Sequence, residues 1–198
     1  MRTDWHTLGT VSLPRLALTA VLIICLSFLP VAAGQQTSDL AGSPVDPLKL
    51  SPGRIVVLVF VRTDCPLSNR YAPLIQELSV KYARESAFWL VFPDKSKSSE
   101  EIRAYLQEYN YKLSALRDPE HDLVKKSGVK VTPEVAVFNA KRELIYHGRI
   151  DNLYEDFGRS RRAATTHELA DAIEAAGKGV TPPTASVDGV GCFISDLR

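Results

Sequence analysis

Residues 54–70, RIVVLVFVRTDCPLSNR, decide the fold. The unbroken β-branched and aromatic run Arg54–Val61 is typical of a strand buried on both faces of a parallel sheet. From Pro66 onward, apolar residues recur every three or four positions to about Glu85, which predicts a helix whose first turn accommodates the proline. Cys65 is therefore expected at a junction between a buried strand and a helix.

Strand-like runs and helical periodicities alternate along the rest of the chain. The predicted elements are the strand Ala87–Phe92, the helix through Ile102–Tyr109, the strand Leu113–Leu116, a helix opened by Asp118-Pro119 and stopped at Gly128, the hairpin Val135–Tyr146 and the helix Thr166–Ala176. The order β-α-β-α-β-α-β-β-α predicts an α/β fold in which helices flank a central sheet. The closing hairpin makes this sheet mixed rather than wholly parallel.

The N-terminus has the pattern of an export signal. The uncharged run Leu16–Leu29 is shorter than the roughly 20 apolar residues of a membrane span. Val31 and Ala33 fit the small-residue sites of a signal-peptide cleavage, so residues 1–33 are predicted to be removed, leaving a periplasmic or secreted protein that begins at Gly34. The alternative is an uncleaved leader, which would be the chain's only contact with a membrane.

The mature chain divides into three predicted parts. Residues 34–53 are rich in Ser, Pro, Gly and Asp and are predicted to be a linker. Residues 54–176 form the α/β domain. Residues 177–198 form a Gly-, Pro- and Ser-rich tail that carries Cys192. If Cys25 leaves with the leader, Cys65 and Cys192 remain, in a compartment where disulfides persist.

Composition excludes several classes of function. The chain has 198 residues, with 24 Lys and Arg against 23 Asp and Glu, so no strong positive field exists to hold a nucleic acid. No Gly-x-Gly-x-x-Gly or P-loop string occurs, and His121, His147 and His167 are widely spaced. We therefore expect no nucleic-acid partner, no cofactor and no metal.

Cys65 is the first candidate for chemistry. Unpaired backbone N–H groups and the positive end of the helix dipole favour a thiolate at a helix N-terminus. Arg62 and Arg70 flank Cys65 and would add positive potential. The alternative is an inert cysteine, since free cysteines are among the residues most often buried.

The arrangement resembles the thioredoxin-like superfamily between Leu50 and Ala176. The segment Val129–Pro133, just before a hydrophobic strand, matches the place of that superfamily's cis-proline loop, which faces the active cysteine. Cys65–Tyr71 (CPLSNRY) and Gly191–Ile194 (GCFI) look like exported bacterial redoxin-domain proteins, relatives of the alkyl hydroperoxide reductase and thiol-specific antioxidant family.

Three positions depart from the family's patterns. Ser68 stands where thioredoxins have the second cysteine of Cys-x-x-Cys. Arg62 stands where peroxiredoxins usually carry Thr or Ser, three residues before the reactive cysteine. Asn69 stands where the copper-delivery branch has a second cysteine, which argues against copper.

The resemblance implies a thiol-dependent oxidoreductase. Its Cys65 thiolate would attack a disulfide or a peroxide, and an external thiol would supply electrons. Cys192, if the tail reaches Cys65, would resolve the intermediate. The substrate groove would be shaped by Thr132, Pro133, Pro66 and Arg62, with the Thr132 backbone free to pair with an extended substrate.

Two alternatives to a redox-active pair stay open. Cys65 and Cys192 would form a static disulfide in a non-catalytic thioredoxin-like binding module, where closing so long a loop stabilises the fold by about 4 to 5 kcal/mol. Otherwise the two cysteines do not pair at all.

Overall fold

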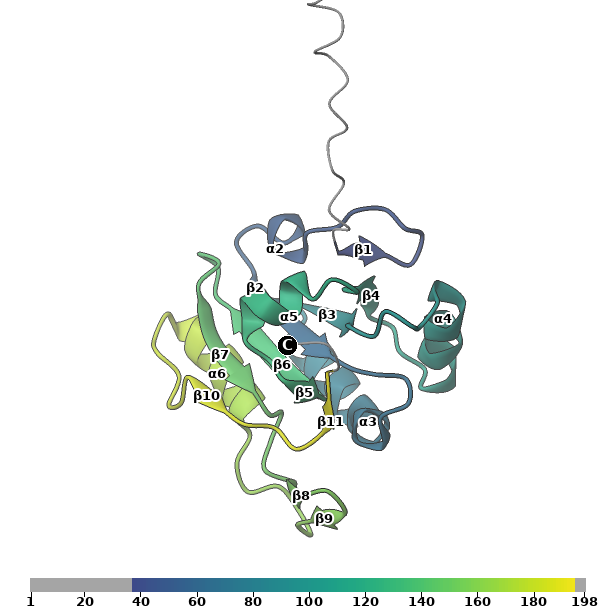
Figure 1. Cartoon of the computed structure of the whole chain (residues 1–198). Helices are drawn as coiled ribbons and strands as arrows, with labels where there is room; N and C mark the ends of the chain where they lie inside the picture. Colours follow the sequence, from purple (N-terminus) through teal and green to yellow (C-terminus); the bar gives the residue numbers. More distant parts are fainter. Residues whose placement is uncertain (1–36, 195–198) are drawn as a thin grey trace, which may run out of the picture. The chain divides into compact units, whose positions relative to one another are not determined.

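A seven-stranded mixed sheet forms the centre of the molecule (Figure 1). The computed structural model describes residues 37–194, so the predicted leader, Cys25 and residues 34–36 lie outside it. The strands, in their order across the sheet, are β1 (Ser38–Asp39), β4 (Ser114–Arg117), β3 (Ser86–Phe92), β2 (Ile55–Phe60), β6 (Glu134–Phe138), β7 (Leu144–Gly148) and β10 (Ser186–Val187). Strands β2, β3 and β4 are parallel to one another, whereas β6 pairs antiparallel with β2 and β7 pairs antiparallel with β6. The predicted α/β fold with a central mixed sheet is confirmed.

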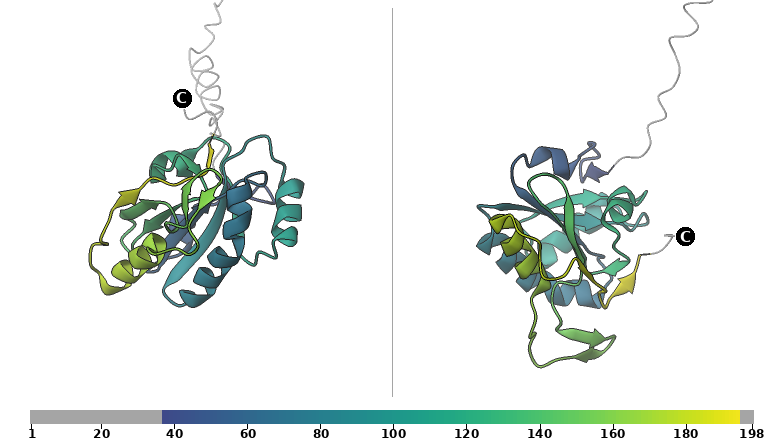
Figure 2. Two further views of the ribbon diagram at one scale, coloured as in Figure 1. Left: turned by 90° about the horizontal axis from the view of Figure 1, so that it is seen from below. Right: turned by 90° about the vertical axis from the view of Figure 1, so that its left-hand side faces the viewer.

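Helices cover both faces of this sheet (Figure 2). The helices are α2 (Pro47–Leu50), α3 (Pro66–Lys81), α4 (Ser99–Glu108), α5 (Asp122–Ser127) and α6 (Glu168–Lys178). Alternate residues of β2 enter different hydrophobic clusters: Val57 and Val59 pack with α3, α4 and α6, while Val56 and Leu58 pack with α2 and α5. Every residue of β2 is buried, as expected for a central strand with helices on both sides.

The segment predicted to be a linker is part of the domain wherever it is described. Strand β1 pairs antiparallel with β4 at the edge of the sheet, and Leu48 of α2 is buried. The buried hydroxyl of Thr37 donates to the Asp118 carboxylate, and the Asp46 side chain caps α2. Residues 37–53 therefore pack against the domain as an N-terminal arm. The contacts with β4 and Asp118 join residues that are far apart in the sequence, so they leave no periodic pattern.

Helix boundaries differ from the predictions by a few residues. Helix α3 ends at Lys81 rather than near Glu85. Helix α5 begins at Asp122, because residues 119–121 form a turn after Asp118, whose carboxylate accepts the N–H groups of Asp122 and Val124. No helix within residues 37–194 is long and apolar enough to cross a membrane.

The C-terminal tail returns across the molecule and adds two short strands. Strand β10 pairs parallel with β7, and β11 (Cys192–Phe193) pairs antiparallel with β5 (Val131–Thr132), as Figure 1 shows. A further hairpin, β8 (Tyr154–Asp156) with β9 (Arg159–Ser160), projects from the body of the domain. The tail strands and this hairpin were not predicted.

Candidate functional site

Cys65 lies where β2 gives way to α3. It is the N-cap residue of α3, and Pro66 occupies the first helical position, where its missing N–H costs no hydrogen bond. The Cys65 residue is 0% exposed. The predicted strand-to-helix junction is therefore observed, with its thiol buried at the helix N-terminus.

The Sγ atoms of Cys65 and Cys192 are 2.7 Å apart, although 127 residues separate the two cysteines. Both are free thiols in this structure; Cys65 is buried and Cys192 is partly exposed. Cys65 also donates a hydrogen bond to the carbonyl oxygen of Thr132 at 3.1 Å. The tail thus reaches Cys65, and a disulfide between the two residues needs only a small movement of the sulfur atoms.

The two thiols differ in acidity. Burial raises the pKa of Cys65, but hydrogen bonds from Cys192 and from the backbone N–H and hydroxyl of Ser68 outweigh burial and bring the pKa below the ordinary cysteine value. Burial, the hydrogen bond to Cys65 and the negative charge of that neighbour raise the pKa of Cys192 to about 12. Cys65 is therefore the first of the two thiols to lose its proton as the pH rises.

Ser68 has a function that the sequence reasoning missed. From the sequence alone, Ser68 is only the residue at the position of the second cysteine of Cys-x-x-Cys. Its side chain is fully buried in the first turn of α3, where Oγ accepts the N–H of Arg62 at 3.4 Å. Hydrogen bonds from its N–H and hydroxyl help to lower the pKa of Cys65. The signal was available, since a hydroxyl three residues after an N-cap cysteine lies over the same turn.

The cis-proline loop lies against Cys65. The Thr132–Pro133 peptide bond is cis, as predicted from the Val-x-x-Thr-Pro segment. The Thr132 backbone is not free, however, because Cys192 pairs with it in the β5–β11 ladder. The expected place for an extended substrate is thus filled by the chain's own tail.

Arg62 contacts this tail instead of presenting a free cationic group. Its guanidinium forms ion pairs with Asp64 and Asp94, at 2.9 Å and 3.4 Å. Its Nη1 also donates to the carbonyl oxygen of Phe193 at 3.2 Å. The Arg62 side chain therefore joins the loop before Cys65 to the tail strand β11.

Glu134 is a second site residue that the sequence reasoning missed. Its carboxylate is 3% exposed and accepts the N–H groups of Lys130, Val131 and Gly189. The Glu134 carboxylate therefore connects the cis-proline loop to the C-terminal tail through these hydrogen bonds. The available signal was a carboxylate at the start of an otherwise apolar strand.

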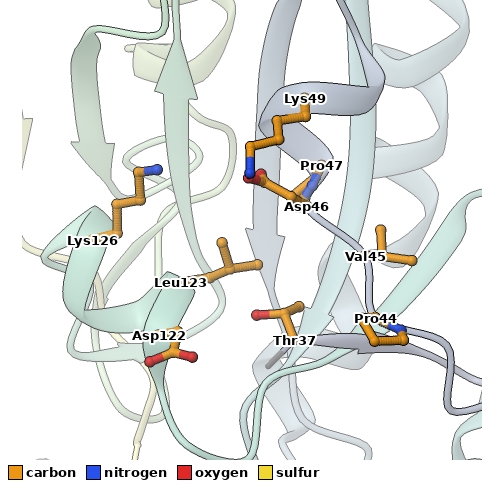
Figure 3. A pocket seen from close by; sticks show the side chains of 9 residues that line it. All are labelled: Thr37, Pro44, Val45, Asp46, Pro47, Lys49, Asp122, Leu123 and Lys126. Carbon is orange, nitrogen blue, oxygen red and sulfur yellow. The ribbon is translucent and has the colours of Figure 1, made fainter. Parts of the chain in front are cut away.

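A pocket of about 380 Å³ adjoins the tail strand β11, and neither cysteine lines it. Two exposed aromatic side chains line it, Phe157 from the β8–β9 turn and Phe193 from β11. Another pocket, of about 340 Å³, lies between α2 and α5 (Figure 3), where the Lys49 amine meets the Asp46 carboxylate at 3.4 Å. None of the residues that line this second pocket belongs to the cysteine site.

The described residues hold no group of three or more His, Cys, Asp or Glu side chains suited to a metal ion. The pair Cys65 and Cys192 alone supplies two sulfur ligands. What this arrangement can do chemically is exchange two electrons between a dithiol and a disulfide.

Comparison with known proteins agrees with the fold. A family model described as thioredoxin-like matches residues 53–144. A hypothetical protein of Sinorhizobium meliloti has a TM-score of 0.67 and 21% identity, over 79% of this chain and 87% of that chain. An uncharacterized conserved protein of Geobacillus kaustophilus also has a TM-score of 0.67, with 17% identity, over 80% of this chain and 86% of that one.

A secreted disulfide oxidoreductase of Mycobacterium tuberculosis, described as homologous to DsbE of E. coli, has a TM-score of 0.51 and 17% identity, over 73% of this chain and 96% of that chain. No curated protein matches the sequence. The resemblance to the thioredoxin-like superfamily is confirmed, while the finer relation to alkyl hydroperoxide reductases stays a prediction.

Proposed function

A thioredoxin-like family model matches residues 53–144, and from that resemblance we propose that this chain is a thiol-disulfide oxidoreductase whose redox group is the pair Cys65 and Cys192. One observation carries the proposal: the two sulfur atoms are 2.7 Å apart. The lowered pKa of Cys65 supports it, because the thiolate is the nucleophile in disulfide exchange.

The proposed cycle transfers two electrons. The dithiol reduces a substrate disulfide to two thiols and becomes the Cys65–Cys192 disulfide, which an external thiol donor reduces again. With a peroxide, the Cys65 thiolate would instead take one oxygen and become a sulfenic acid, releasing an alcohol or water. Cys192 would then form the same disulfide and release water. Either substrate fits the pair, and we propose the disulfide because Arg62 stands where peroxiredoxins carry the hydroxyl side chain.

The predicted groove residues remain part of the proposal. Pro66 begins α3 directly after Cys65, and Thr132 and Pro133 form the loop opposite. Arg62 holds the backbone of β11. Because Thr132 and Arg62 already hold β11, we assign these residues to positioning the sulfur pair toward a substrate.

We propose further that the protein acts outside the cytoplasm, in the periplasm or after secretion. The leader pattern of residues 1–33 supports this. So does the description of the mycobacterial structural relative as secreted.

A static disulfide is the second candidate, and the anchoring of the tail favours it. Ile194 is 6% exposed in the hydrophobic cluster with α5, and the Gly189 N–H donates to Glu134 at 2.8 Å. In this second candidate, a thioredoxin-like binding module, the Cys65–Cys192 disulfide would only reinforce a tail that is already docked.

Redox equilibrium distinguishes the two candidates. Full-length protein carrying Cys25→Ser is equilibrated with mixtures of reduced and oxidised glutathione, and free thiols are counted by alkylation and mass spectrometry. An oxidoreductase pair gives a two-electron midpoint above about −300 mV, whereas a structural bridge lies below that value. Cys192→Ser and Cys65→Ser are the matched controls, and each removes the transition.

A turnover measurement completes the test. Wild-type protein is expected to reduce or oxidise a disulfide-bonded peptide catalytically with a thiol donor present, and each single variant loses at least tenfold in rate. A low midpoint together with unchanged turnover in the variants would favour the binding module. Consumption of hydrogen peroxide faster than consumption of the peptide would reassign the substrate.

A further inference from the structure

The two sulfur atoms of the site are unequally accessible. Cys65 has no exposed surface, since the first turn of α3, the carbonyl of Thr132 and strand β11 enclose it. Cys192 is partly exposed. A molecule in solution therefore meets the sulfur of the tail first.

We propose that a substrate thiolate attacks the Cys65–Cys192 disulfide at Cys192, so that the mixed disulfide forms on the tail and Cys65 is the leaving group. This inference rests on the proposed function and specifies the step in which a thiol reduces the Cys65–Cys192 disulfide. That thiol is the donor of the proposed cycle or, when the cycle runs in reverse, the substrate. Residues that match a thioredoxin motif place the reactive cysteine at Cys65, whereas the geometry points to Cys192 as the sulfur that the substrate contacts.

The step balances in atoms and electrons. The substrate thiolate forms an S–S bond with Cys192 while the Cys192–Cys65 bond breaks, and the electron pair leaves on Cys65. A second substrate thiolate then attacks the mixed disulfide at the substrate's sulfur atom. This attack forms the substrate disulfide and releases Cys192 as a thiolate, which then takes up a proton. Two substrate thiols are oxidised and one protein disulfide is reduced.

The chemistry of the leaving group favours the same direction. Thiol-disulfide exchange is faster when the departing sulfur has the lower pKa. Burial raises the pKa of Cys65 but hydrogen bonds outweigh it, and the two from Ser68 remain when Cys192 is attacked. Burial, the largest cause, raises the pKa of Cys192. Attack at Cys192 expels the stabilised thiolate, whereas attack at Cys65 would expel the poor leaving group.

Attack at Cys192 also leaves the tail in place. Reaching Cys65 would require separating β11 from β5, breaking the Arg62 contact with Phe193 and withdrawing Ile194 from its cluster. Gly191 allows the close docking, because a Cβ there would collide with the carbonyl oxygen of Thr132. The docked tail thus exposes the sulfur atom of Cys192 and covers that of Cys65.

The test locates the first mixed disulfide. Full-length protein carrying Cys25→Ser is oxidised, and formation of the Cys65–Cys192 disulfide is checked by mass spectrometry before any thiol is added. Reduced glutathione is then added, the reaction is quenched with acid at several short times, and free thiols are alkylated. Peptide mapping extrapolated to zero time is expected to show at least tenfold more glutathione on Cys192 than on Cys65.

Two variants relate the result to the docked tail. Gly191→Ala is expected to lift β11 and reduce the preference for Cys192 at least fivefold. Gly177→Ala is the control, because nothing lies within 4 Å of a Cβ at that helical position, and it retains the preference. Unfolding oxidised wild-type protein in guanidinium is expected to abolish the preference.

Three outcomes overturn the inference. Equal or greater labelling of Cys65 at zero time contradicts it directly, and a preference for Cys192 that persists in guanidinium removes its geometric basis. Failure of the disulfide to form in the first step overturns the inference and the proposed function together. A redox-active disulfide labelled on Cys65 overturns the inference alone.

Discussion

The carboxylate of Glu134 accepts the backbone N–H of Gly189 at 2.8 Å, which joins the strand after the cis-proline loop to the C-terminal tail. Its other oxygen accepts the N–H groups of Lys130 and Val131, at 2.7 Å and 3.2 Å. One buried carboxylate therefore fixes the loop that contacts Cys65 and the tail that carries Cys192.

Glu134→Gln is expected to loosen this junction. An amide nitrogen is a donor and does not accept an N–H, so at least one buried N–H loses its partner, at a cost of about 1 to 3 kcal/mol in the free energy of unfolding. Denaturant unfolding measures that loss. The rate at which iodoacetamide alkylates Cys65 in reduced protein is expected to rise at least fivefold, because the tail docks less firmly.

Lys130→Ala is the matched control for Glu134→Gln. It removes the side chain that forms an ion pair with Asp188 at 3.4 Å, where the two side chains are 67% and 92% exposed. Such a surface pair contributes little to stability, so both stability and Cys65 alkylation are expected to stay unchanged. Unchanged alkylation in Glu134→Gln as well would show that Glu134 does not hold the tail over Cys65.

The centre of the fold was predictable because its signals are local. Every residue of β2 is apolar and buried, so the run Ile55–Phe60 identifies a central strand without knowledge of its neighbours. The segment Val129–Pro133 likewise carries its own pattern, and its cis bond is present. A strand buried on both faces and a proline with restricted geometry can each be recognised from a few adjacent residues.

The tail and the N-terminal segment were not predictable in the same way. Thr37 donates to Asp118, 81 residues away, and Ile194 contributes a single side chain to a distant cluster. Contacts of this kind depend on where the completed sheet presents a partner. The sequence could raise the possibility that Cys192 approaches Cys65, but the covering of Cys65 by β11 needed the assembled domain.

The leader offers a prediction that the described residues do not test. The run Leu16–Leu29, followed by Val31 and Ala33, is expected to direct export and cleavage before Gly34. Intact-mass measurement of protein recovered from the exported fraction is expected to give a chain that begins at Gly34. Ala33→Leu enlarges the residue at the cleavage site and is expected to slow cleavage. Exported protein that retains Met1 would support an uncleaved leader instead.

The ion pair between Arg149 and Glu168 predicts a pH-dependent contribution to stability. Burial raises the pKa of the Glu168 carboxyl, but hydrogen bonds from Arg149 and Thr166 outweigh burial and lower it below its ordinary value. A carboxyl whose folded-state pKa is lowered stabilises the protein above the unfolded-state pKa of about 4.3 and loses this contribution as the pH falls through the folded-state value.

Glu168→Gln is expected to lower the free energy of unfolding by about 1 to 3 kcal/mol at pH 7, and to reduce the difference in stability between pH 7 and pH 3. Denaturant unfolding at several pH values measures both effects. Glu100→Gln is the control, because that side chain is 81% exposed in its pair with Arg103, and its stability profile should follow the wild type. If the stability of Glu168→Gln changed with pH in the same way as that of the wild type, the pH-dependent contribution would not come from Glu168.

Ser68→Ala is expected to raise the pKa of Cys65. The hydroxyl of Ser68 donates to the Cys65 thiolate from within the same helical turn, so its removal leaves that charge with fewer hydrogen bonds in a buried position. Because the pKa of Cys192 is about 12, Cys65 alone ionises below pH 10 in the reduced protein with Cys25→Ser. The pH dependence of Cys65 alkylation, followed by mass spectrometry, measures the shift.

The same substitution connects acidity to the direction of electron transfer. A less stable Cys65 thiolate is a poorer leaving group, so thiols should reduce the Cys65–Cys192 disulfide more slowly in Ser68→Ala than in wild type. Ser79→Ala, on the same helix but bonded only to the Gln76 carbonyl, is the control and should change neither quantity. A raised pKa with an unchanged reduction rate would mean that departure of Cys65 does not limit the exchange, and an unchanged pKa would remove Ser68 from the site.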